Sequence, residues 1–132
     1  MKEPRWLTRD IVLALHDESL AHFGGPEGLR DEAMLESALA RPRQRFAYAA
    51  QPSLADLAAA YGFGIIRNHP FVDGNKRTGL LCVAVFLHIN GLEFYPDEVD
   101  EVRIILAVAA GELGEAEFAA WIGDNARSVR DR

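Results

Sequence analysis

The segment 69–91 constrains the fold more than any other part of this sequence, because a polar turn there leads directly into a long apolar run. Residues 80–89 place apolar side chains on every side of a helix apart from His88, and Asn90-Gly91 is a typical helix stop. A helix that is apolar all round is normally buried in the core. The pattern therefore predicts a buried central helix that starts at about Asn75, with the polar turn held at its N-terminus.

Capping residues and apolar spacing predict five more helices along the chain. Ser, Thr and Asp side chains accept hydrogen bonds from first-turn amides, and glycine or proline commonly ends a helix. A short strand is possible at 92–95. Together these signals predict an all-α fold, a compact six-helix bundle in which residues 1–132 form one domain. The helices are expected at 8–23, from Asp31 to before Pro42, at 53–68, from about Asn75 to Asn90, from Asp97 to Gly111, and from about Glu115.

Apolar residues that recur at helical spacing indicate which helix faces enter the core. On the fifth helix this reasoning selects a stripe from Val99 to Ala109, for which partner binding is the second interpretation. Cys82 lies inside an apolar run, so we expect a buried and inert thiol. The residues expected to share a buried face are Val12, Leu15 and Phe23; Leu54, Leu57, Ala58, Tyr61 and Ile65; Val99, Val102, Leu106 and Ala109; and Phe118, Trp121 and Ile122.

The composition argues for a globular, cytoplasmic protein that contacts neither nucleic acid nor a membrane directly. At 132 residues the chain is long enough to bury a core, and its net charge of −6 argues against the basic face that nucleic-acid backbones require. One cysteine cannot form an internal disulfide, and no apolar run is long enough for a membrane span. The amino terminus has no signal-peptide pattern. Disorder is expected at most in the tail near 128–132.

The polar turn gathers groups that suit phosphate chemistry: His69, Asp73, Asn75, Lys76 and Arg77. The first amides of a helix lack intrahelical partners and, together with the helix dipole and two adjacent cations, they favour a bound anion. His69 can accept a proton near neutral pH, which makes it the candidate general base. Asp73 offers a hard oxygen ligand for magnesium beside the expected phosphates, and Asn75 could orient either partner.

Residues 69–79, His-Pro-Phe-Val-Asp-Gly-Asn-Lys-Arg-Thr-Gly, resemble the core motif of the Fic/Doc family, whose broad form is His-x-Phe-x-(Asp/Glu)-Gly-Asn-Gly-Arg-x-x-Arg. Lys76 replaces the third small residue of the nucleotidyl-transferring Fic enzymes, and Leu80 replaces their second arginine. Both departures are typical of the Doc branch, as are the segments 28–31 and 35–42. Gly74 is instead the residue of the Fic form, since Doc itself has alanine there. The resemblance implies a Fic/Doc-like helical bundle over nearly the whole chain.

The resemblance also implies a toxin of a type II toxin–antitoxin system that acts as an ATP-dependent phosphotransferase. The γ-phosphoryl group of ATP would pass to a hydroxyl, expected to be a threonine of elongation factor Tu, and translation would stop. ATP and Mg²⁺ are the implied cofactors. Because the sequence lacks the inhibitory segment of self-regulating Fic enzymes, a small Phd-like antitoxin is the implied partner, with its carboxy-terminal segment in a groove beside the active site.

On this basis the candidate catalytic residues are His69, Asp73, Lys76 and Arg77, with Asp73 as the metal ligand. Two other functions stay open from the sequence. One is transfer of AMP, which Gly74 favours and which Lys76 and Leu80 oppose. The other is a catalytically silent binding module, which the complete polar set opposes. The candidate nucleotide- or phosphate-binding residues are Gly74, Asn75, Lys76, Arg77 and Arg67.

Several of these residues also have a purely structural interpretation. A lone histidine at a helix end often ties backbone groups together, and Asp-Gly-Asn is common in turns and caps. The adjacent cations favour the functional interpretation, since cations are unfavourable at the N-terminal end of a helix unless an anion joins them. His16, His22 and His88 are expected to be structural or surface groups. Arg30, Glu36 and Arg41 are expected to form a charged helix surface, with contact to nucleotide, target protein or antitoxin as the second interpretation.

Overall fold

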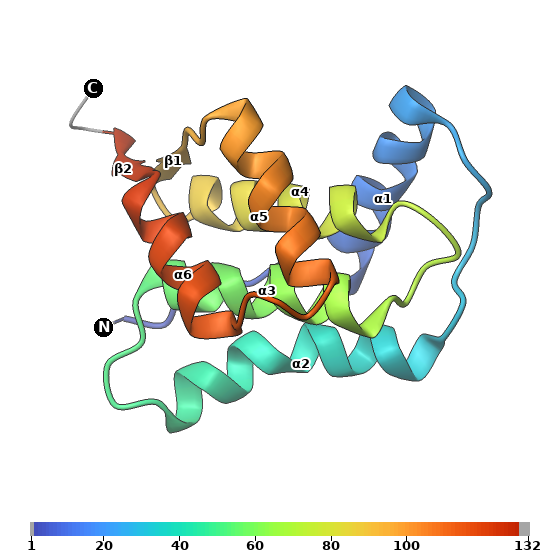
Figure 1. Ribbon diagram of the computed structural model, residues 1–132. Coiled ribbons are helices and arrows are strands. Elements are labelled where there is room, and N and C mark those ends of the chain that lie inside the picture. The colour runs from blue at the N-terminus through green and yellow to red at the C-terminus, as the bar shows by residue number, and fades with distance from the viewer. Residues whose placement is uncertain (1, 130–132) are drawn as a thin grey trace.

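The chain forms six α-helices and two short strands within residues 2–129, which are the residues that this computed structural model describes (Figure 1). All six predicted helices are present, so the predicted helical fold is confirmed. The elements in chain order are α1 (Arg9–Phe23), α2 (Glu32–Tyr48), α3 (Leu54–Asn68), α4 (Asn75–Ile89), β1 (Leu92–Phe94), α5 (Glu98–Ala109), α6 (Glu115–Asp124) and β2 (Ala126–Ser128).

Side-chain caps set the start of most of these helices, as the sequence indicates. Thr8 accepts a hydrogen bond from a first-turn amide of α1, and Ser53 forms a capping box with Asp56 on α3. Asp97 accepts from a first-turn amide of α5 in the same way. A cap of this kind contributes about 1 kcal/mol. Local sequence therefore decides where these helices begin.

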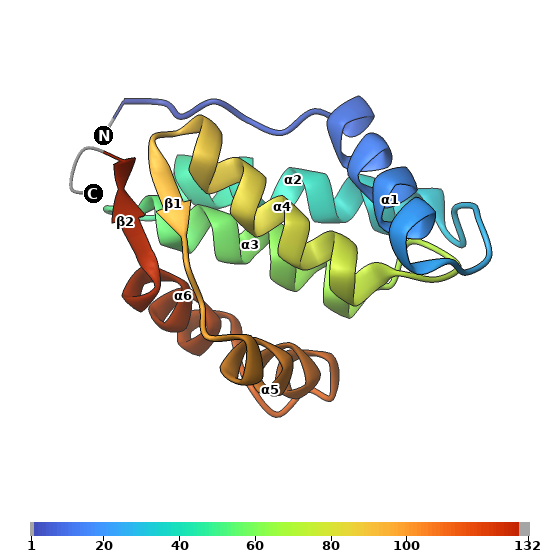
Figure 2. The same ribbon diagram turned by 90° about the horizontal axis from the view of Figure 1, so that it is seen from above.

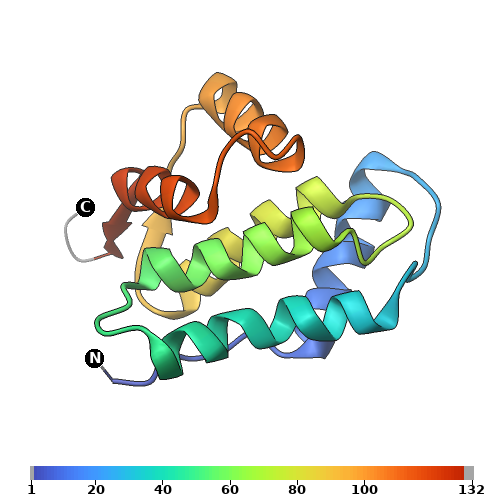
Figure 3. The same ribbon diagram turned by 60° about the horizontal axis from the view of Figure 1, so that its bottom comes forward.

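The centre of the fold is formed by α3 and α4. α3 packs against α2, α4 and α6 (Figures 1 and 3), and its residues 57–66 are all buried except Phe63. α4 buries a further set that includes Cys82 and Phe86. The buried helix expected after the polar turn is therefore present, and it shares the centre of the fold with α3.

Two glycines let α3 and α4 approach closely. A Cβ atom added at Gly62 would lie 2.7 Å from Val83 Cγ2, and one added at Gly79 would lie 2.7 Å from Ile66 Cγ1. Side-chain carbon atoms do not pack at such distances, so each helix needs glycine where it crosses the other. The close crossing holds the polar turn between two helices that cannot separate without opening the core.

α2 is longer than predicted. The prediction ended this helix before Pro42, but the helix continues through Pro42 to its end six residues later. A proline inside a helix removes one backbone hydrogen bond and costs about 3 kcal/mol, so contacts beyond it must compensate. Phe46 packs edge-on against Trp6 with ring centroids 5.7 Å apart, and Arg45 pairs with Glu115 of α6 at 3.3 Å. These tertiary contacts hold the second half of the helix in place.

The predicted core faces of α5 and of the end of α1 are wrong. α5 carries apolar residues on more than one side, so periodicity alone does not identify the side that contacts α3, α4 and α6. At the end of α1, Phe23 is 71% exposed, although Val12 of the same helix is buried. On α5 the large apolar residues that are more than half exposed are Val99, Val102 and Leu106, while Ile104, Ile105 and Val108 are buried.

β1 and β2 form a small antiparallel pair beside the end of α4 (Figure 2). Leu92 pairs with Ser128, and Phe94 pairs with Ala126. The extended piece predicted at 92–95 is therefore confirmed, whereas its partner strand was not predicted. Ser128, expected to begin a disordered tail, lies in β2, and residues 130–132 of that tail lie outside the described residues. Across residues 2–129, none of the helices combines the length and apolar character needed to cross a membrane.

Candidate active site

The polar turn lines a cavity of about 390 Å³ at the meeting point of α3, α4 and α5. All seven residues that the sequence assigns to catalysis or phosphate binding lie at this cavity. Two apolar residues, one from α3 and one from α5, complete its lining. The lining residues are Ile66, Arg67, His69, Asp73, Gly74, Asn75, Lys76, Arg77 and Ala109.

His69 ends α3 in a left-handed backbone conformation, with φ 55° and ψ 52°. It is the one non-glycine residue with positive φ in the part of the chain that the structure describes. This conformation costs about 1–2 kcal/mol for a residue with a Cβ atom, and such strain is common at active sites. The surrounding contacts must therefore hold His69 in place.

Asn75 joins the two ends of the polar turn through one buried side chain. Its Oδ1 accepts from Phe71 N at 2.9 Å, and its Nδ2 donates to Phe71 O at 2.9 Å and to His69 Nδ1 at 3.1 Å. An amide nitrogen only donates, so Nδ1 of His69 is an acceptor and the neutral ring carries its proton on Nε2. Nε2 has no partner among the described residues, which leaves it for a ligand.

Asp73 is held by α1 and by the glycine-rich segment that follows α1. His16 of α1 is buried, contacts the carbonyl oxygen of Asp73 through Nε2 at 2.8 Å, and stacks on Phe71 with ring centroids 3.8 Å apart. Gly25 lies against the carboxylate, since a Cβ atom there would be 2.2 Å from Asp73 Oδ2. The carboxylate therefore occupies space that only glycine at position 25 leaves open.

α4 begins without a side-chain cap, in contrast to α1, α2, α3 and α5. Its first-turn amides face the cavity end of the helix and can serve an anion. Lys76 is exposed there. Arg77 lines the cavity but reaches towards α1, where its Nε donates to Ser19 Oγ at 3.1 Å and its guanidinium lies 5.0 Å from the centre of the Phe23 ring.

Arg67 connects the cavity to the end of α5. Its Nη1 donates to the carbonyl oxygen of Val108 at 3.3 Å, and a Cβ atom at Gly111 would lie 2.7 Å from the same nitrogen. A cation is favourable at the C-terminal end of a helix. Arg67 therefore fixes α5 at the edge of the cavity while presenting positive charge to it.

The segment 28–31 runs antiparallel beside the polar turn and holds its backbone. Val72 N donates to Gly28 O at 3.0 Å, and Arg30 N donates to Pro70 O at 2.7 Å. These bonds satisfy turn groups that would otherwise need water. The turn is thereby tied to the chain between α1 and α2 as well as to α3 and α4.

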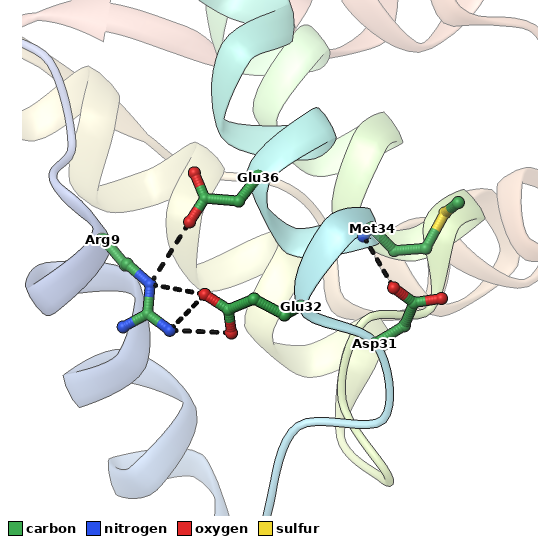
Figure 4. A network of polar contacts seen from close by, with 5 residues as sticks. All are labelled: Arg9, Asp31, Glu32, Met34 and Glu36. Atoms are coloured by element: carbon green, nitrogen blue, oxygen red, sulfur yellow. Dashed lines mark hydrogen bonds and ion pairs between the residues drawn. The ribbon is translucent and has the colours of Figure 1, made fainter.

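A cluster of charged side chains fixes the start of α2 to α1 (Figure 4). Arg9 of α1 contacts Glu32 at 2.6 Å and Glu36 at 3.5 Å. Away from Arg9, Asp31 caps α2 by accepting from Met34 N at 3.1 Å. Exposed pairs of this kind contribute little to stability. They join α1 to the start of α2 at the surface, without contacting the polar turn.

The sequence of this chain matches a known protein family and two named relatives. Residues 6–87 match the Fic/DOC family. The chain belongs to the Fic/DOC family. It is 30% identical over 115 residues to a protein named Protein kinase doc from Escherichia phage P1, which covers 87% of this chain and 90% of the relative. It is 42% identical over 103 residues to Toxin Doc from Mycolicibacterium smegmatis, which covers 76% and 77% respectively. The family predicted from the motif is confirmed.

Two side chains outside the Fic/DOC motif contact the polar turn, and sequence reasoning missed both. His16 was expected to be structural or at the surface; it is structural, and its partner is the turn itself. Arg30 was expected on a charged helix surface, but it precedes α2 and contacts the carbonyl oxygen of His69 at 2.6 Å. Only the position of Arg30 in the Doc-like segment 28–31 could have drawn attention to it.

The remaining candidate residues lie outside the cavity at the polar turn. Glu36 pairs with Arg9, and Arg41 pairs with Glu115, so neither lines the site. His22 and His88 are exposed. Within residues 2–129 no three His, Cys, Asp or Glu side chains converge on a possible metal position.

Proposed function

We propose that this chain is a Doc-type toxin kinase, which transfers the γ-phosphoryl group of ATP to a hydroxyl group of a target protein. The observation that carries the proposal is the convergence of His69, Asp73, Lys76 and Arg77 at the uncapped N-terminus of α4. The relatives named Protein kinase doc and Toxin Doc support the kinase and the toxin respectively. The family resemblance supports a threonine of elongation factor Tu as the target, so that transfer would arrest translation.

In this reaction the target hydroxyl oxygen bonds to the γ-phosphorus, the bond from phosphorus to the β–γ bridging oxygen breaks, and ADP leaves. His69 accepts the hydroxyl proton at Nε2. The neutral ring must first move its own proton to Nδ1, which gives up the hydrogen bond from Asn75. That step costs about 1–3 kcal/mol, because it leaves a buried N–H of Asn75 without an acceptor. This cost is small beside the barriers that enzymes lower.

Positive charge around the cavity neutralises the phosphates. Lys76, Arg77 and the first amides of α4 lie on one side, and Arg67 lies on the other. Asp73 is the carboxylate among the cavity-lining residues, and Mg²⁺ is commonly held by one or two carboxylates together with phosphate oxygens and water. The donor set therefore fits Mg²⁺ bound with the nucleotide, where the ion would neutralise phosphate charge. Positioning and electrostatics supply the rate.

Intact-mass spectrometry of elongation factor Tu, after incubation with this protein, ATP and Mg²⁺, tests the proposal. We expect the wild type to add one phosphoryl group and His69→Ala to add none while keeping its circular-dichroism spectrum. His88→Ala removes an exposed histidine outside the cavity and is the matched control, which should react like the wild type.

Other outcomes of this experiment would each overturn one part of the proposal. Addition of AMP would replace phosphoryl transfer by the rival reaction that Gly74 favours. An unmodified elongation factor beside another modified protein in a lysate would overturn the target. No modified protein in any lysate would leave the binding module as the function.

We also propose a Phd-like antitoxin as the partner, bound in an apolar groove beside the active site. Two cavities of about 350 and 180 Å³ lie along α4, the larger reaching the end of α1 and β1 and the smaller reaching α5, and they share Arg77, Leu80 and Glu101. Val102 and Leu106 line the smaller one and are more than half exposed. Because Arg77 lines both the groove and the active-site cavity, a segment bound in the groove would act directly on a catalytic residue.

A pair of α5 variants tests the antitoxin groove. Leu106→Asp should raise the Kd for a co-purified antitoxin by about tenfold or more, because a charge replaces a buried apolar contact in the complex. Val99→Asp should bind normally, since Val99 is exposed on α5 but lines neither cavity. Equal binding by both variants, measured by titration calorimetry, would place the antitoxin elsewhere. Failure of any co-expressed neighbouring gene product to restore growth would contradict the partner itself.

A further inference from the structure

Arg30 binds the backbone of the candidate base from outside the family motif. Its Nε donates to the carbonyl oxygen of His69 at 2.6 Å, and its Nη2 donates to that of Asn68 at 2.9 Å. Its backbone N–H donates to Pro70 O at 2.7 Å. One residue therefore binds three consecutive carbonyl groups, across the point where α3 ends and the polar turn begins.

These contacts act where the backbone most needs support. The last carbonyl groups of a helix lack intrahelical donors, and His69 holds a left-handed φ of 55° that residues with a Cβ atom rarely adopt. A guanidinium suits this place because it is always charged, it donates through a rigid planar fork, and a cation is favourable at a helix C-terminus. The imidazole ring of His69 is held separately, by the amide of Asn75.

We propose that Arg30 is a positioning residue for the transfer reaction: it fixes the backbone of His69 so that the imidazole stays at the place where the target proton leaves. This inference rests on the proposed function. Arg30 does not line the cavity, so its removal should loosen His69 without removing a contact to ATP. The expected consequence is a loss in kcat at nearly constant KM for ATP.

Steady-state phosphoryl transfer by Arg30→Ala, Arg30→Lys and Arg9→Ala tests this role. For Arg30→Ala we expect kcat to fall by about 10- to 100-fold, as a small displacement of a catalytic group can cause, with KM for ATP within about twofold. Arg30→Lys should lie between Arg30→Ala and the wild type, because an ammonium reaches fewer carbonyls at once. Arg9→Ala removes an exposed arginine that pairs with the first turn of α2 but not with the polar turn, and it should keep the wild-type kcat.

Chemical rescue separates positioning from a general loss of structure. Because Arg30 is exposed, added methylguanidinium can enter the space left in Arg30→Ala and should restore part of its kcat. The same addition should leave His69→Ala inactive. No rescue, a kcat unchanged in Arg30→Ala, an equal loss in Arg9→Ala, or a raised KM at constant kcat would each overturn the assignment.

A measurement without turnover keeps this inference separate from the proposed reaction. In nuclear magnetic resonance spectra, the backbone amide and ring signals of His69 should shift or broaden in Arg30→Ala and stay in place in Arg9→Ala. Unchanged His69 signals in Arg30→Ala would overturn the positioning role even if the wild type is active. A wild type that transfers nothing, with His69 signals that do respond to Arg30→Ala, would instead overturn the proposed function alone.

Discussion

At the scale of single residues, the amide of Asn75 decides which nitrogen of His69 carries the proton. Phe71 N–H fixes the amide oxygen of Asn75, so the amide nitrogen must face His69 Nδ1, 3.1 Å away. Because that nitrogen only donates, we expect neutral His69 to carry its proton on Nε2 in the free protein. The proposed function of His69 as a base then requires a proton shift within the ring, which would make Asn75 a determinant of how often His69 is ready to react.

Long-range ¹H–¹⁵N correlation spectra, recorded at a pH where the imidazoles are neutral, measure this tautomer directly. His69 should show a protonated Nε2. His88 is an internal control with the opposite expectation, because its Nδ1 lies 3.0 Å from Glu93 Oε1 and must donate. Asn75→Ala should remove the preference at His69 and leave His88 unchanged. A wild-type His69 with its proton on Nδ1 would contradict the contact with Asn75.

At the scale of elements, the crossing of α3 and α4 depends on Gly79. A Cβ atom there would meet Ile66 Cγ1 at 2.7 Å and the backbone oxygen of Gly62 at 3.1 Å, and the backbone cannot yield as a side chain can. We expect Gly79→Ala to lower the free energy of unfolding by about 1–3 kcal/mol, as measured by urea denaturation. It should also lower transfer, because the shift of α4 displaces the first-turn amides.

Gly123→Ala on α6 is the matched control for that prediction. The nearest atom to a Cβ at Gly123 is Ala55 Cβ at 3.6 Å, which is an ordinary contact. Alanine favours a helix over glycine by up to about 1 kcal/mol, so Gly123→Ala should be neutral or stabilising. Two variants that are equally stable would mean that α3 and α4 do not cross as closely as the structure has them.

Among the helices, those bounds that local contacts fix can be predicted from the sequence, and those that distant contacts fix cannot. Thr8, Ser53 and Asp97 mark helix starts because a cap binds an amide three residues away. Pro42 misleads, because its cost is offset by contacts that α2 makes with distant parts of the chain. The exposed face of α5 misleads for a similar reason, since an element that is apolar on several sides is oriented by its neighbours alone.

The candidate site likewise combines contacts that are local in sequence, which a motif can predict, with long-range contacts, which it cannot. The motif residues are close in sequence, so a turn between two helices is enough to gather them at one cavity. The contacts of His16 with Asp73 and of Arg30 with His69 span 57 and 39 residues. They depend on how α1 and the start of α2 pack against the turn, and no local pattern contains that information.

At the scale of the whole molecule, two weak acids buried in the helical core make the fold sensitive to alkaline pH. Burial raises the pKa of the Cys82 thiol from 9.0 to about 12, and it raises the pKa of Tyr61 from 10.0 to about 12. The unfolded chain has the ordinary values, so it releases both protons at a lower pH than the folded chain does. Stability from this source is therefore complete below pH 9 and is lost as the pH rises towards 12.

Urea denaturation at a series of pH values tests this dependence. Above the ordinary pKa of each group, the free energy of unfolding should fall by up to about 1.4 kcal/mol per pH unit for that group. Cys82→Ala should flatten the decline between pH 9 and 10, where only the thiol of this pair ionises in the unfolded chain, although the lost sulfur lowers the whole curve. Tyr61→Phe should keep that early decline and reduce the later one. An identical early slope in Cys82→Ala and the wild type would mean that the thiol ionises as freely in the folded chain as in the unfolded one, and α4 would then not be the buried helix that holds the polar turn.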